Sequence, residues 1–259
     1  MKSRETVRKV LTVILALVAL ACAGYLVWYY VVSEQTNASY DEARQIAGGS
    51  AESVDRERLN VLPEAENPID FEALQEVNPD VYAWITIEGT NVDYPIVQRT
   101  DDDNYYLDHT WEGVSASQGA IFTQAFNQKN FMDFNTVIYG HQMGAGNDSM
   151  FHTLDRYLEE GFMEEHPVVM IYTPDHVYTY EVFAAVVYDD RHLMQYYNYV
   201  MDSERQKFLD SLYNSRDMRN QYRDGAEVTV DDRIISLSTC IPSEEEHRLL
   251  VEAVLVNES

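Results

Sequence analysis

The chain has 259 residues, and 18 lysines and arginines against 44 aspartates and glutamates give it a formal net charge of −26 at pH 7. This excess of negative charge argues against nucleic acid or an anionic membrane surface as a partner, because like charges repel at long range. It favours neutral or basic partners, although the simpler interpretation is that acidity keeps an exposed domain soluble.

Residues 10–32 form a run of about 23 uncharged, mostly apolar residues, long enough for a helix to cross a hydrocarbon core of roughly 30 Å. The segment that follows is mainly acidic, so the positive-inside rule places residues 1–9 in the cytoplasm and the C-terminal part outside the cell. A cleaved signal peptide is the alternative, but its apolar region usually spans only about 7 to 15 residues. We therefore expect an uncleaved, single-pass anchor in the cell membrane. Basic residues precede the run: Lys2, Arg4, Arg8 and Lys9.

Residues 33–68 are polar and acidic, with a Gly48-Gly49-Ser50 stretch, and we interpret them as an extracellular stalk or linker that is partly helical. Residues 69–259 are long enough for one domain with a substantial core. Short alternating or β-branched runs separated by turn residues predict eight or nine strands and therefore an antiparallel barrel or sandwich. The predicted strands are 83–87, 93–98, 119–123, 135–139, 167–173, 176–188, 226–230, 233–239 and 249–256.

Helices are a minor part of this prediction. The clearest one covers residues 203–212, where Ser203 and Gln206 have the spacing of a capping box. Apolar residues follow on one helical face: Phe208, Leu209 and Leu212. Shorter helices are expected at residues 71–76 and 150–157.

The chain has two cysteines, and only Cys240 lies outside the predicted membrane span. Since Cys22 is inside that span, Cys240 has no disulfide partner in its own compartment and is either buried and inert or reactive. Cys240 ends a β-branched run, and Arg248 follows eight positions later. A second β-rich run about a hundred residues upstream ends on His141.

These three residues form a plausible catalytic set. If the strands before and after residues 241–247 pair antiparallel, Arg248 stands beside Cys240, where its guanidinium can bind a carbonyl oxygen and stabilise an oxyanion. His141 can supply a proton to a leaving amine if its strand neighbours that of Cys240. Each residue alone has a simpler structural explanation, such as an ion pair of Arg248 with the acidic run 244–246. Their joint occurrence favours acyl transfer.

No metal or cofactor is expected. The six other histidines are scattered without ligand spacing, and the acidic run 101–103 lacks the glycine and the distal glutamate of an EF-hand loop. We interpret that run as a solvated turn.

The sequence resembles the sortases, which are membrane-anchored cysteine transpeptidases of Gram-positive bacteria. Leu237-Ser-Thr-Cys240 with Arg248, together with Asn135-Thr-Val-Ile-Tyr-Gly-His141, is similar to the sortase active-site signature. Other segments resemble the family in the expected order: Tyr82-Ala-Trp-Ile, residues 89–98, Tyr105-Tyr-Leu and Gly119-Ala-Ile-Phe122. Three features look most like class B: Tyr139-Gly-His-Gln-Met143, Met150-Phe151 after it, and the helix predicted before the last strands.

This resemblance implies a mainly β fold, a closed eight-stranded sortase-like barrel with a few short helices, preceded by the transmembrane helix. It implies Cys240 as nucleophile, His141 as general acid and then base, and Arg248 as the ligand of the oxyanion, with Ser238 and Thr239 lining the peptide groove. The partners would be the C-terminal sorting motif of a secreted surface protein and an amine, from either a peptidoglycan precursor or a pilin lysine.

Other interpretations fit less well. L,D-transpeptidases carry a histidine and a glycine next to their cysteine, which Ser238-Thr-Cys240 lacks. In papain-like peptidases the cysteine precedes the histidine and opens a helix. A catalytically inactive, membrane-tethered peptide-binding module of the same fold is the non-enzymatic alternative. We also predict a hinge in residues 142–149, because Gly144 and Gly146 closely follow His141.

Overall fold

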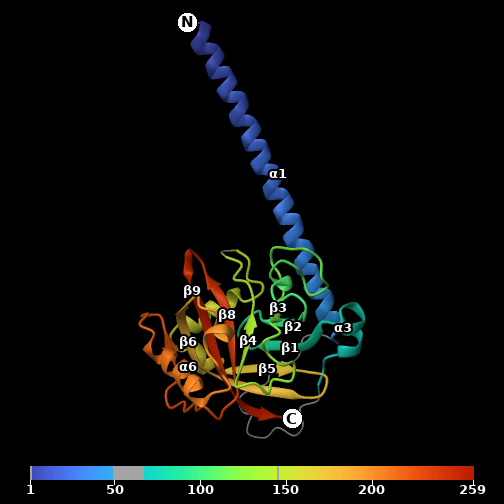
Figure 1. Cartoon of the computed structure of the whole chain (residues 1–259). Helices are drawn as coiled ribbons and strands as arrows, with labels where there is room; N and C mark the ends of the chain where they lie inside the picture. The colour runs from blue at the N-terminus through green and yellow to red at the C-terminus, as the bar shows by residue number, and fades with distance from the viewer. Residues whose placement is uncertain (1, 49–66, 145) are drawn as a thin grey trace. The chain divides into compact units, whose positions relative to one another are not determined.

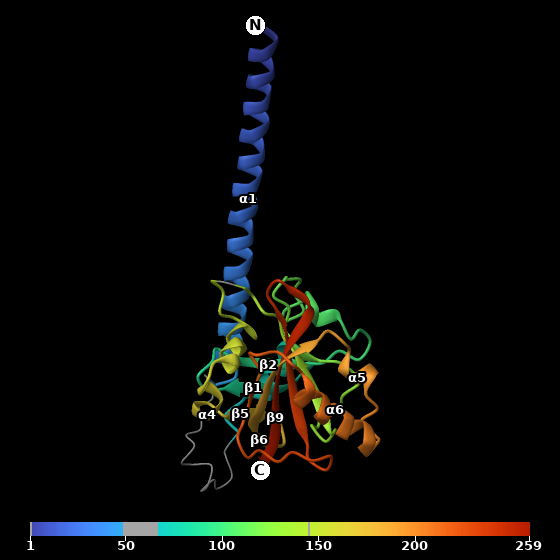
Figure 2. The same cartoon turned by 90° about the vertical axis from the view of Figure 1, so that its left-hand side faces the viewer.

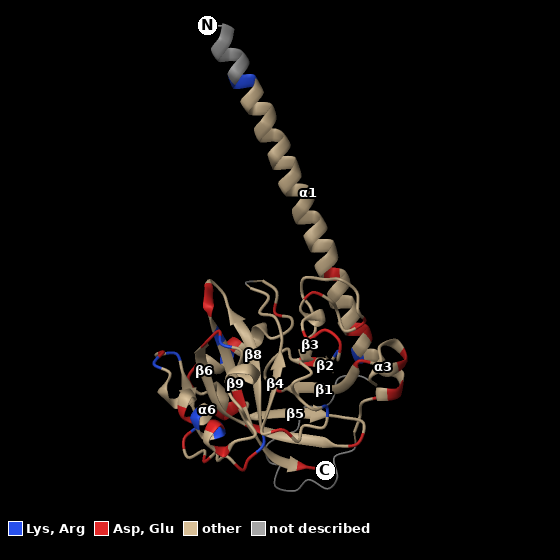
Figure 3. Ribbon diagram, in the orientation of Figure 1, with Lys and Arg blue, Asp and Glu red and all other residues tan. Residues whose placement is uncertain are grey.

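The computed structural model describes residues 2–48, 67–144 and 146–259. The chain divides into two compact units, Met1–Ser39 and Tyr40–Ser259. The first unit is most of α1 (Lys2–Ile46), a helix of 45 residues (Figure 1). Its long middle stretch carries no charged side chain (Figure 3). It is the one helix in the described part of the chain that is long and apolar enough to cross a membrane, which is consistent with membrane anchoring.

The second unit begins earlier in the chain than residue 69, where we expected the domain to start. The last turns of α1 belong to it, because Tyr40, Ala43 and Ala47 are buried in its core. The Tyr40 hydroxyl donates a hydrogen bond to the Gly119 carbonyl oxygen at 2.6 Å. Most of the predicted stalk, residues 49–66, lies outside the described residues.

Eight strands of the second unit close into a barrel, as predicted. Around the ring the order is β5-β1-β2-β3-β4-β8-β9-β6, and β6 closes it by pairing with β5. A ninth strand among the described residues, β7, has only two residues and pairs with β6 alone. The strands are β1 (Val81–Ile87), β2 (Asp93–Val97), β3 (Ile121–Thr123), β4 (Asn135–Tyr139), β5 (Val168–Tyr172), β6 (Val177–Asp189), β7 (Gln221–Tyr222), β8 (Ile234–Ile241) and β9 (Glu244–Glu258).

The barrel is not wholly antiparallel, which corrects one expectation. The pairs β2–β3 and β4–β8 are parallel, and the other pairs of the ring are antiparallel. The β4–β8 pair is parallel because the chain leaves β4 at its carboxyl end and returns through a long connection that contains β5, β6 and the helices. Parallel neighbours end at the same edge of a sheet, so this pair brings two strand ends together.

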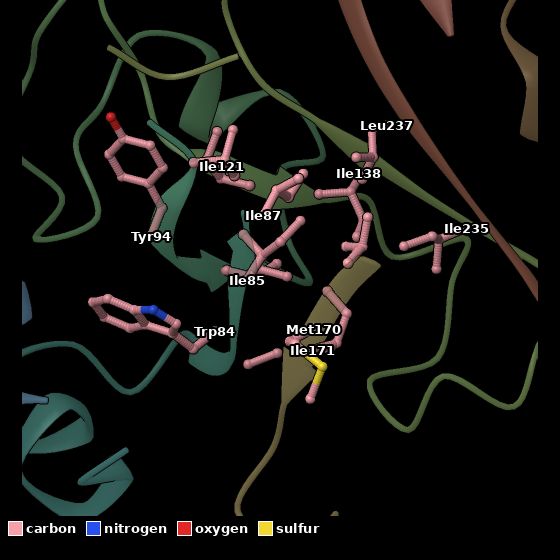
Figure 4. Close-up of a cluster of buried hydrophobic side chains, with 14 of the residues drawn as sticks. Trp84, Ile85, Ile87, Tyr94, Ile121, Ile138, Met170, Ile171, Ile235 and Leu237 are labelled. Carbon is pink, nitrogen blue, oxygen red and sulfur yellow. The ribbon is translucent and has the colours of Figure 1, made fainter. Parts of the chain in front are cut away.

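Side chains from several strands fill the barrel, and Figure 4 shows some of them, including Ile85, Ile138 and Leu237. A second buried cluster covers the outer face of β4, β6, β8 and β9. It lies under the helical insert, residues 193–214, which comprises α5 (Leu193–Tyr196) and α6 (Asp202–Asn214) (Figure 2). Burial on both faces explains why the central strands are apolar almost throughout.

Residues 226–230 do not form the predicted strand. Their burial does alternate, with Ala226 and Val228 packed against the second cluster and Glu227 exposed. Among the described residues no strand pairs with them, and the nearby edge of β6 pairs with β7. The alternation therefore reflects a half-buried surface segment and not a sheet.

The helices match the expectations in place but not in every detail. Helix α6 begins at Asp202, one residue before the predicted start, and Met201 is its N-cap, with no side-chain hydrogen bond. The capping box that we predicted at Ser203 is therefore wrong. The remaining short helices of the described residues are α3 (Phe71–Val77), η1 (Tyr105–Leu107), η2 (His152–Leu158) and α4 (Phe162–Glu165).

Short turns join β1 to β2 and β5 to β6, which pair as antiparallel hairpins. Gly89, between β1 and β2, has a φ of +75°, and a Cβ there would lie 2.5 Å from the His166 ring, so only glycine fits. The connection between β8 and β9 is tighter than the predicted loop 241–247. Ile241 pairs with Glu244, and Ser243 adopts a φ of +66° in the turn.

Candidate active site

The site residues lie where the ends of three strands meet. Strand β4 runs beside β8 with Tyr139 opposite Ser238, so the chain leaves both strands at one edge of the barrel. His141 follows β4 by two residues, and Cys240 lies two residues beyond Ser238. In the β8–β9 hairpin, Cys240 is the register partner of Arg248. The antiparallel β8–β9 pairing and the neighbourhood of β4 and β8, the two conditions on which the catalytic interpretation depended, are both present.

A surface pocket of about 240 Å³ lies at this edge. All five residues singled out from the sequence line it: Ser238, Thr239, Cys240, His141 and Arg248. Its remaining wall is formed by residues 188–193, at the end of β6 and just after it, together with Asn104, Leu107, Phe122, Gln124, Tyr139, Gly140 and Leu250. A single concave site therefore holds a thiol, an imidazole and a guanidinium.

Cys240 is exposed and free, as a reactive thiol must be. The residues just before it are held in the sheet, since Ser238 and Thr239 are buried. The Thr239 hydroxyl oxygen has no hydrogen-bond partner among the described residues. The thiol is thus presented to solvent by a rigid strand, next to a polar atom that a ligand can satisfy.

The His141 ring is fixed by the backbone of η1. Its Nε2 lies 2.7 Å from the Leu107 carbonyl oxygen. A carbonyl oxygen only accepts hydrogen bonds, so Nε2 carries a proton and donates it. The neutral ring therefore has its basic lone pair on Nδ1, and the protonated ring has its exchangeable acidic proton there.

Arg248 does not form the ion pair with residues 244–246 that was the simpler explanation of its presence. Its Nη1 donates to the backbone carbonyl oxygens of Glu245 and His247, at 2.9 and 2.8 Å. These bonds hold one arm of the guanidinium against the hairpin. The carboxylate of Glu244 instead accepts hydrogen bonds from both terminal nitrogens of Arg219, at 2.8 and 3.1 Å.

Arg219 fastens the hairpin that carries the thiol. It also donates to Asp217, so one guanidinium joins the segment after α6 to the start of β9. The cation lowers the pKa of Asp217 to about 2 and holds the pKa of Glu244 below its ordinary value. This ion network positions the turn between Cys240 and Arg248.

A scan against protein-family models matches the sortase domain over residues 85–256. The chain belongs to the sortase family. Curated sortase B of Listeria monocytogenes is 37% identical over 185 residues, covering 71% of this chain and 72% of the relative. Curated sortase B of Staphylococcus aureus is 29% identical over 250 residues, covering 95% of this chain and 96% of the relative.

Solved structures agree. Sortase B from Bacillus anthracis in complex with AAEK1 superposes with a TM-score of 0.69 at 29% identity, covering 88% of this chain and 99% of that one. The chain is therefore a sortase-type cysteine transpeptidase, most like class B. The helical insert before β8 lies where the sequence resemblance placed it.

Sequence reasoning missed a large part of the sortase pocket. The wall of residues 188–193 begins in the last residues of a long strand and continues into a segment whose pattern does not distinguish it from an ordinary loop. In this wall Arg191 donates to Asp189, with Nε at 2.6 Å from Oδ1. The Tyr139 hydroxyl and Gln124 Oε1, which are buried beside the pocket, lack partners among the described residues. Only the adjacency of their strands reveals them.

The segment after His141 is tied down at both ends. Gln142 Nε2 donates to Asp155 Oδ2 at 2.8 Å, and Gln142 pairs with Met150 as an isolated β-bridge. Burial raises the pKa of Asp155. Gly144 and Gly146 both have positive φ, and residue 145 lies outside the described residues. The hinge predicted for residues 142–149 stays a prediction.

Proposed function

We propose that this sortase cleaves a sorting motif near the C-terminus of a secreted protein after its threonine and transfers the acyl group to an amine. The proposal rests on one observation: Cys240, His141 and Arg248 line the same pocket. These are the groups that thiol acyl transfer needs: a nucleophile, a proton carrier and a cationic ligand for an oxyanion.

In the first half-reaction the Cys240 sulfur attacks the threonyl carbonyl carbon, and the carbonyl oxygen becomes an oxyanion beside the Arg248 guanidinium. The carbon–nitrogen bond then breaks, and His141 gives its proton to the departing amine. Since Nε2 is held by the Leu107 carbonyl oxygen, the transferred proton comes from Nδ1. The product is a thioester on Cys240.

In the second half-reaction an amine attacks the thioester carbon. His141 takes a proton from the attacking nitrogen, the carbon–sulfur bond breaks and the thiolate of Cys240 is restored. We propose an amine of a peptidoglycan precursor or a lysine of a pilin as the acceptor. The first would attach the secreted protein to the cell wall, and the second would build a pilus.

Peptide binding to the pocket is supported by a relative. The Staphylococcus aureus sortase B–substrate complex superposes on this chain with a TM-score of 0.67 at 28% identity, covering 87% of this chain and 98% of that one. We propose that the sorting peptide lies along Ser238 and Thr239, where the unpaired Thr239 hydroxyl and Tyr139 hydroxyl offer hydrogen bonds. Specificity would then come from the buried polar atoms of the wall.

We further propose that residues 1–9 lie in the cytoplasm, that residues 10–32 span the membrane, and that the part beyond them is extracellular. Apolar length and flanking charge support this arrangement. The anchor would hold the enzyme at the surface where secreted proteins emerge.

The test is single-turnover mass spectrometry of the full chain in detergent, with a pooled library of candidate sorting peptides. We expect a thioester adduct on Cys240 that an added amine releases, and no adduct on Cys240→Ala. Cys22→Ala is the matched control, because it removes the other thiol and should leave the adduct unchanged. A folded chain whose Cys240 reacts with a small thiol reagent but with no peptide would overturn the proposal.

A further inference from the structure

Glu252 is a carboxyl group at the centre of the fold that the proposed reaction does not use. It lies in β9 and is completely buried. It faces Ser236 across the β8–β9 pair, and the Ser236 hydroxyl is 2.9 Å from Glu252 Oε2. Its other oxygen, Oε1, has no partner among the described residues. A buried carboxylate without a cation is costly, so this group needs an explanation.

The polar row around Glu252 crosses the three strands that carry the site. Asn135 of β4 lies on the other side of Ser236, with Nδ2 at 2.9 Å and Oδ1 at 3.0 Å from the hydroxyl oxygen. Ser236 precedes Cys240 by four residues, and Glu252 follows Arg248 by four. The row therefore joins β4, β8 and β9 beneath the pocket.

The number of protons shared by Ser236 and Glu252 decides which form of Glu252 satisfies the hydrogen bonds of the row. The Ser236 hydroxyl has one proton, and it lies within hydrogen-bonding distance of both Glu252 Oε2 and Asn135 Oδ1. If Glu252 is a neutral acid, it donates to Ser236, and Ser236 donates to Asn135. If Glu252 is ionised, Ser236 must turn to it, and Asn135 Oδ1 loses its donor while the charge stays buried.

The row also holds the helical insert. Asn135 Nδ2 lies 3.3 Å from the hydroxyl of Tyr199, which stands between α5 and α6. Leu193 of α5 packs in the same buried cluster as Leu250 of β9, and both also line the pocket. The insert therefore forms part of the pocket wall. The surface of the barrel on which it packs includes the polar row of Asn135, Ser236 and Glu252.

Few charges face this position. Leu250, two residues before Glu252 in β9, packs in a cluster whose titratable members are the tyrosines Tyr188, Tyr197, Tyr199 and Tyr222, and of these Tyr199 interacts electrostatically with Glu252. Asn135 of β4 and Ser236 of β8 complete the polar row. On α6, the guanidinium of Arg205 is engaged by the backbone oxygens of Tyr199 and Val230 and by Asp202.

Burial therefore dominates the titration of Glu252 and raises its pKa to about 8. The pKa of Tyr199 is raised well above its ordinary value by burial, and a charge on Glu252 raises it further. Tyr199 thus stays neutral where Glu252 ionises.

We propose that Glu252 is a positioning residue that, as a neutral acid, fastens the helical insert over β4, β8 and β9, and that its ionisation loosens the insert and the pocket wall. The folded state holds this proton more tightly than the unfolded state, whose reference pKa is 4.5. Stability from this group is therefore fully present below that value and declines as pH rises to about 8. The inference concerns the wall and holds whatever peptide the pocket binds.

Hydrogen exchange of the full chain in detergent tests this proposal, with rates divided by the intrinsic chemical rate at each pH. Between pH 7 and pH 9.5 we expect residues 193–214 to lose protection by about tenfold, since opening becomes tenfold more favourable per pH unit up to the folded pKa of about 8 and levels off above it. Glu252→Gln stays neutral and should keep its protection. Glu227→Gln, a change at an exposed glutamate, should behave as wild type.

An equal loss of protection in Glu252→Gln and wild type would overturn the proposal. If Glu252→Gln does not fold, carboxyl-carbon NMR of the wild-type chain with labelled glutamate decides. We expect one glutamate carboxyl to titrate near pH 8, as the burial of Glu252 requires. The absence of any glutamate that titrates above pH 7 would equally overturn it.

Discussion

Arg248 lines the pocket, and its guanidinium Nη1 donates to the backbone of the hairpin. A lysine keeps the charge but loses the fork and cannot hold both positions at once. We predict that Arg248→Lys lowers the rate of thioester formation by about a hundredfold, the typical effect of removing an oxyanion ligand.

Rapid-quench kinetics with a cleaved peptide measures this rate. Arg233→Lys is the control, because Arg233 pairs with Glu258, away from the pocket, and should react at the wild-type rate. A loss in Arg248→Lys no larger than in Arg233→Lys would contradict the assigned role.

Thr239 lines the pocket, and its buried hydroxyl oxygen has no hydrogen-bond partner in the described part of the chain. Replacing it by the isosteric valine removes an unsatisfied polar atom, so the free energy of unfolding should not fall. If the hydroxyl binds peptide, Thr239→Val should raise KM for a sorting peptide by about fivefold, the effect of losing one neutral hydrogen bond of roughly 1 kcal/mol.

Thr136→Val is the matched control for this change. Thr136 is equally buried with an unpaired hydroxyl oxygen, but it does not line the pocket. Steady-state kinetics should show a raised KM for Thr239→Val alone. Equal KM values for the two variants would mean that the hydroxyl does not touch the peptide.

At the residue scale, the sequence predicts what is local. Cys240 and Arg248 flank a short hairpin, so their pairing follows from two strands and a turn. The position of His141 beside Cys240 is harder to predict, because the β4–β8 pair joins segments about a hundred residues apart. Only the family resemblance implied that the two residues meet. The wall of residues 188–193 carries no pattern at all, since its place depends on where the insert packs.

Among the elements, α6 shows why a capping motif can mislead. Ser203 and Gln206 have the right spacing, but the N-cap is Met201, two residues before Ser203. Met201 has extended dihedral angles and no side-chain bond to the helix. We predict that Met201→Asp stabilises the protein by about 1 kcal/mol by supplying a cap acceptor.

Chemical denaturation measures this gain in the free energy of unfolding. Ser203→Ala serves as the comparison and should cost little, because Ser203 lies inside the helix. A larger loss in Ser203→Ala than the gain in Met201→Asp would show that the sequence motif was right after all.

The hairpin that carries the thiol depends on Arg219, whose guanidinium lowers the pKa of Asp217 to about 2. A depressed carboxyl pKa contributes stability that is present above the unfolded value of 3.8 and is lost as pH falls towards 2. Since these groups are partly exposed, we expect Arg219→Ala to lower Tm by only about 2 °C at pH 6.

The pH dependence is the sharper test. The difference in Tm between wild type and Arg219→Ala, measured by calorimetry, should shrink as pH falls from 4 to 2. A difference that is constant over this range would mean that packing of the arginine stem, and not its charge, holds the hairpin.

The segment 226–230 shows that alternation of apolar and polar residues does not by itself make a strand. Alternation of apolar and polar residues predicts that one face is buried, and this holds for Ala226 and Val228. A strand also needs a backbone partner, which depends on whether a neighbouring edge is open. Here β7 occupies the edge of β6, and sequence pattern cannot reveal that competition.

For the whole molecule, the compact unit begins at Tyr40 and not at residue 69. Tyr40, Ala43 and Ala47 fill the core, and the Tyr40 ring meets Tyr94 edge-on with centroids 5.2 Å apart. We predict that a chain beginning at residue 69 has a Tm about 10 °C below one beginning at residue 36, since losing a buried aromatic costs about 3 to 5 kcal/mol.

Thermal unfolding of the two shortened chains gives the comparison. Tyr40→Ala in the longer chain should reproduce most of the loss, which assigns it to the side chain. Equal Tm values for the two lengths would show that the end of α1 rests on the barrel without stabilising it.

The parallel pairing of β4 with β8 has a consequence for how the enzyme matures. Asn135 and Ser236 are hydrogen-bonded across the pair although they stand 101 positions apart in the chain. Contacts between such distant segments form late in folding, because a long loop must close first. An emerging chain therefore has its imidazole long before its thiol, and the two meet only when the ring of strands is complete. Peptide cleavage would thus report on a finished barrel.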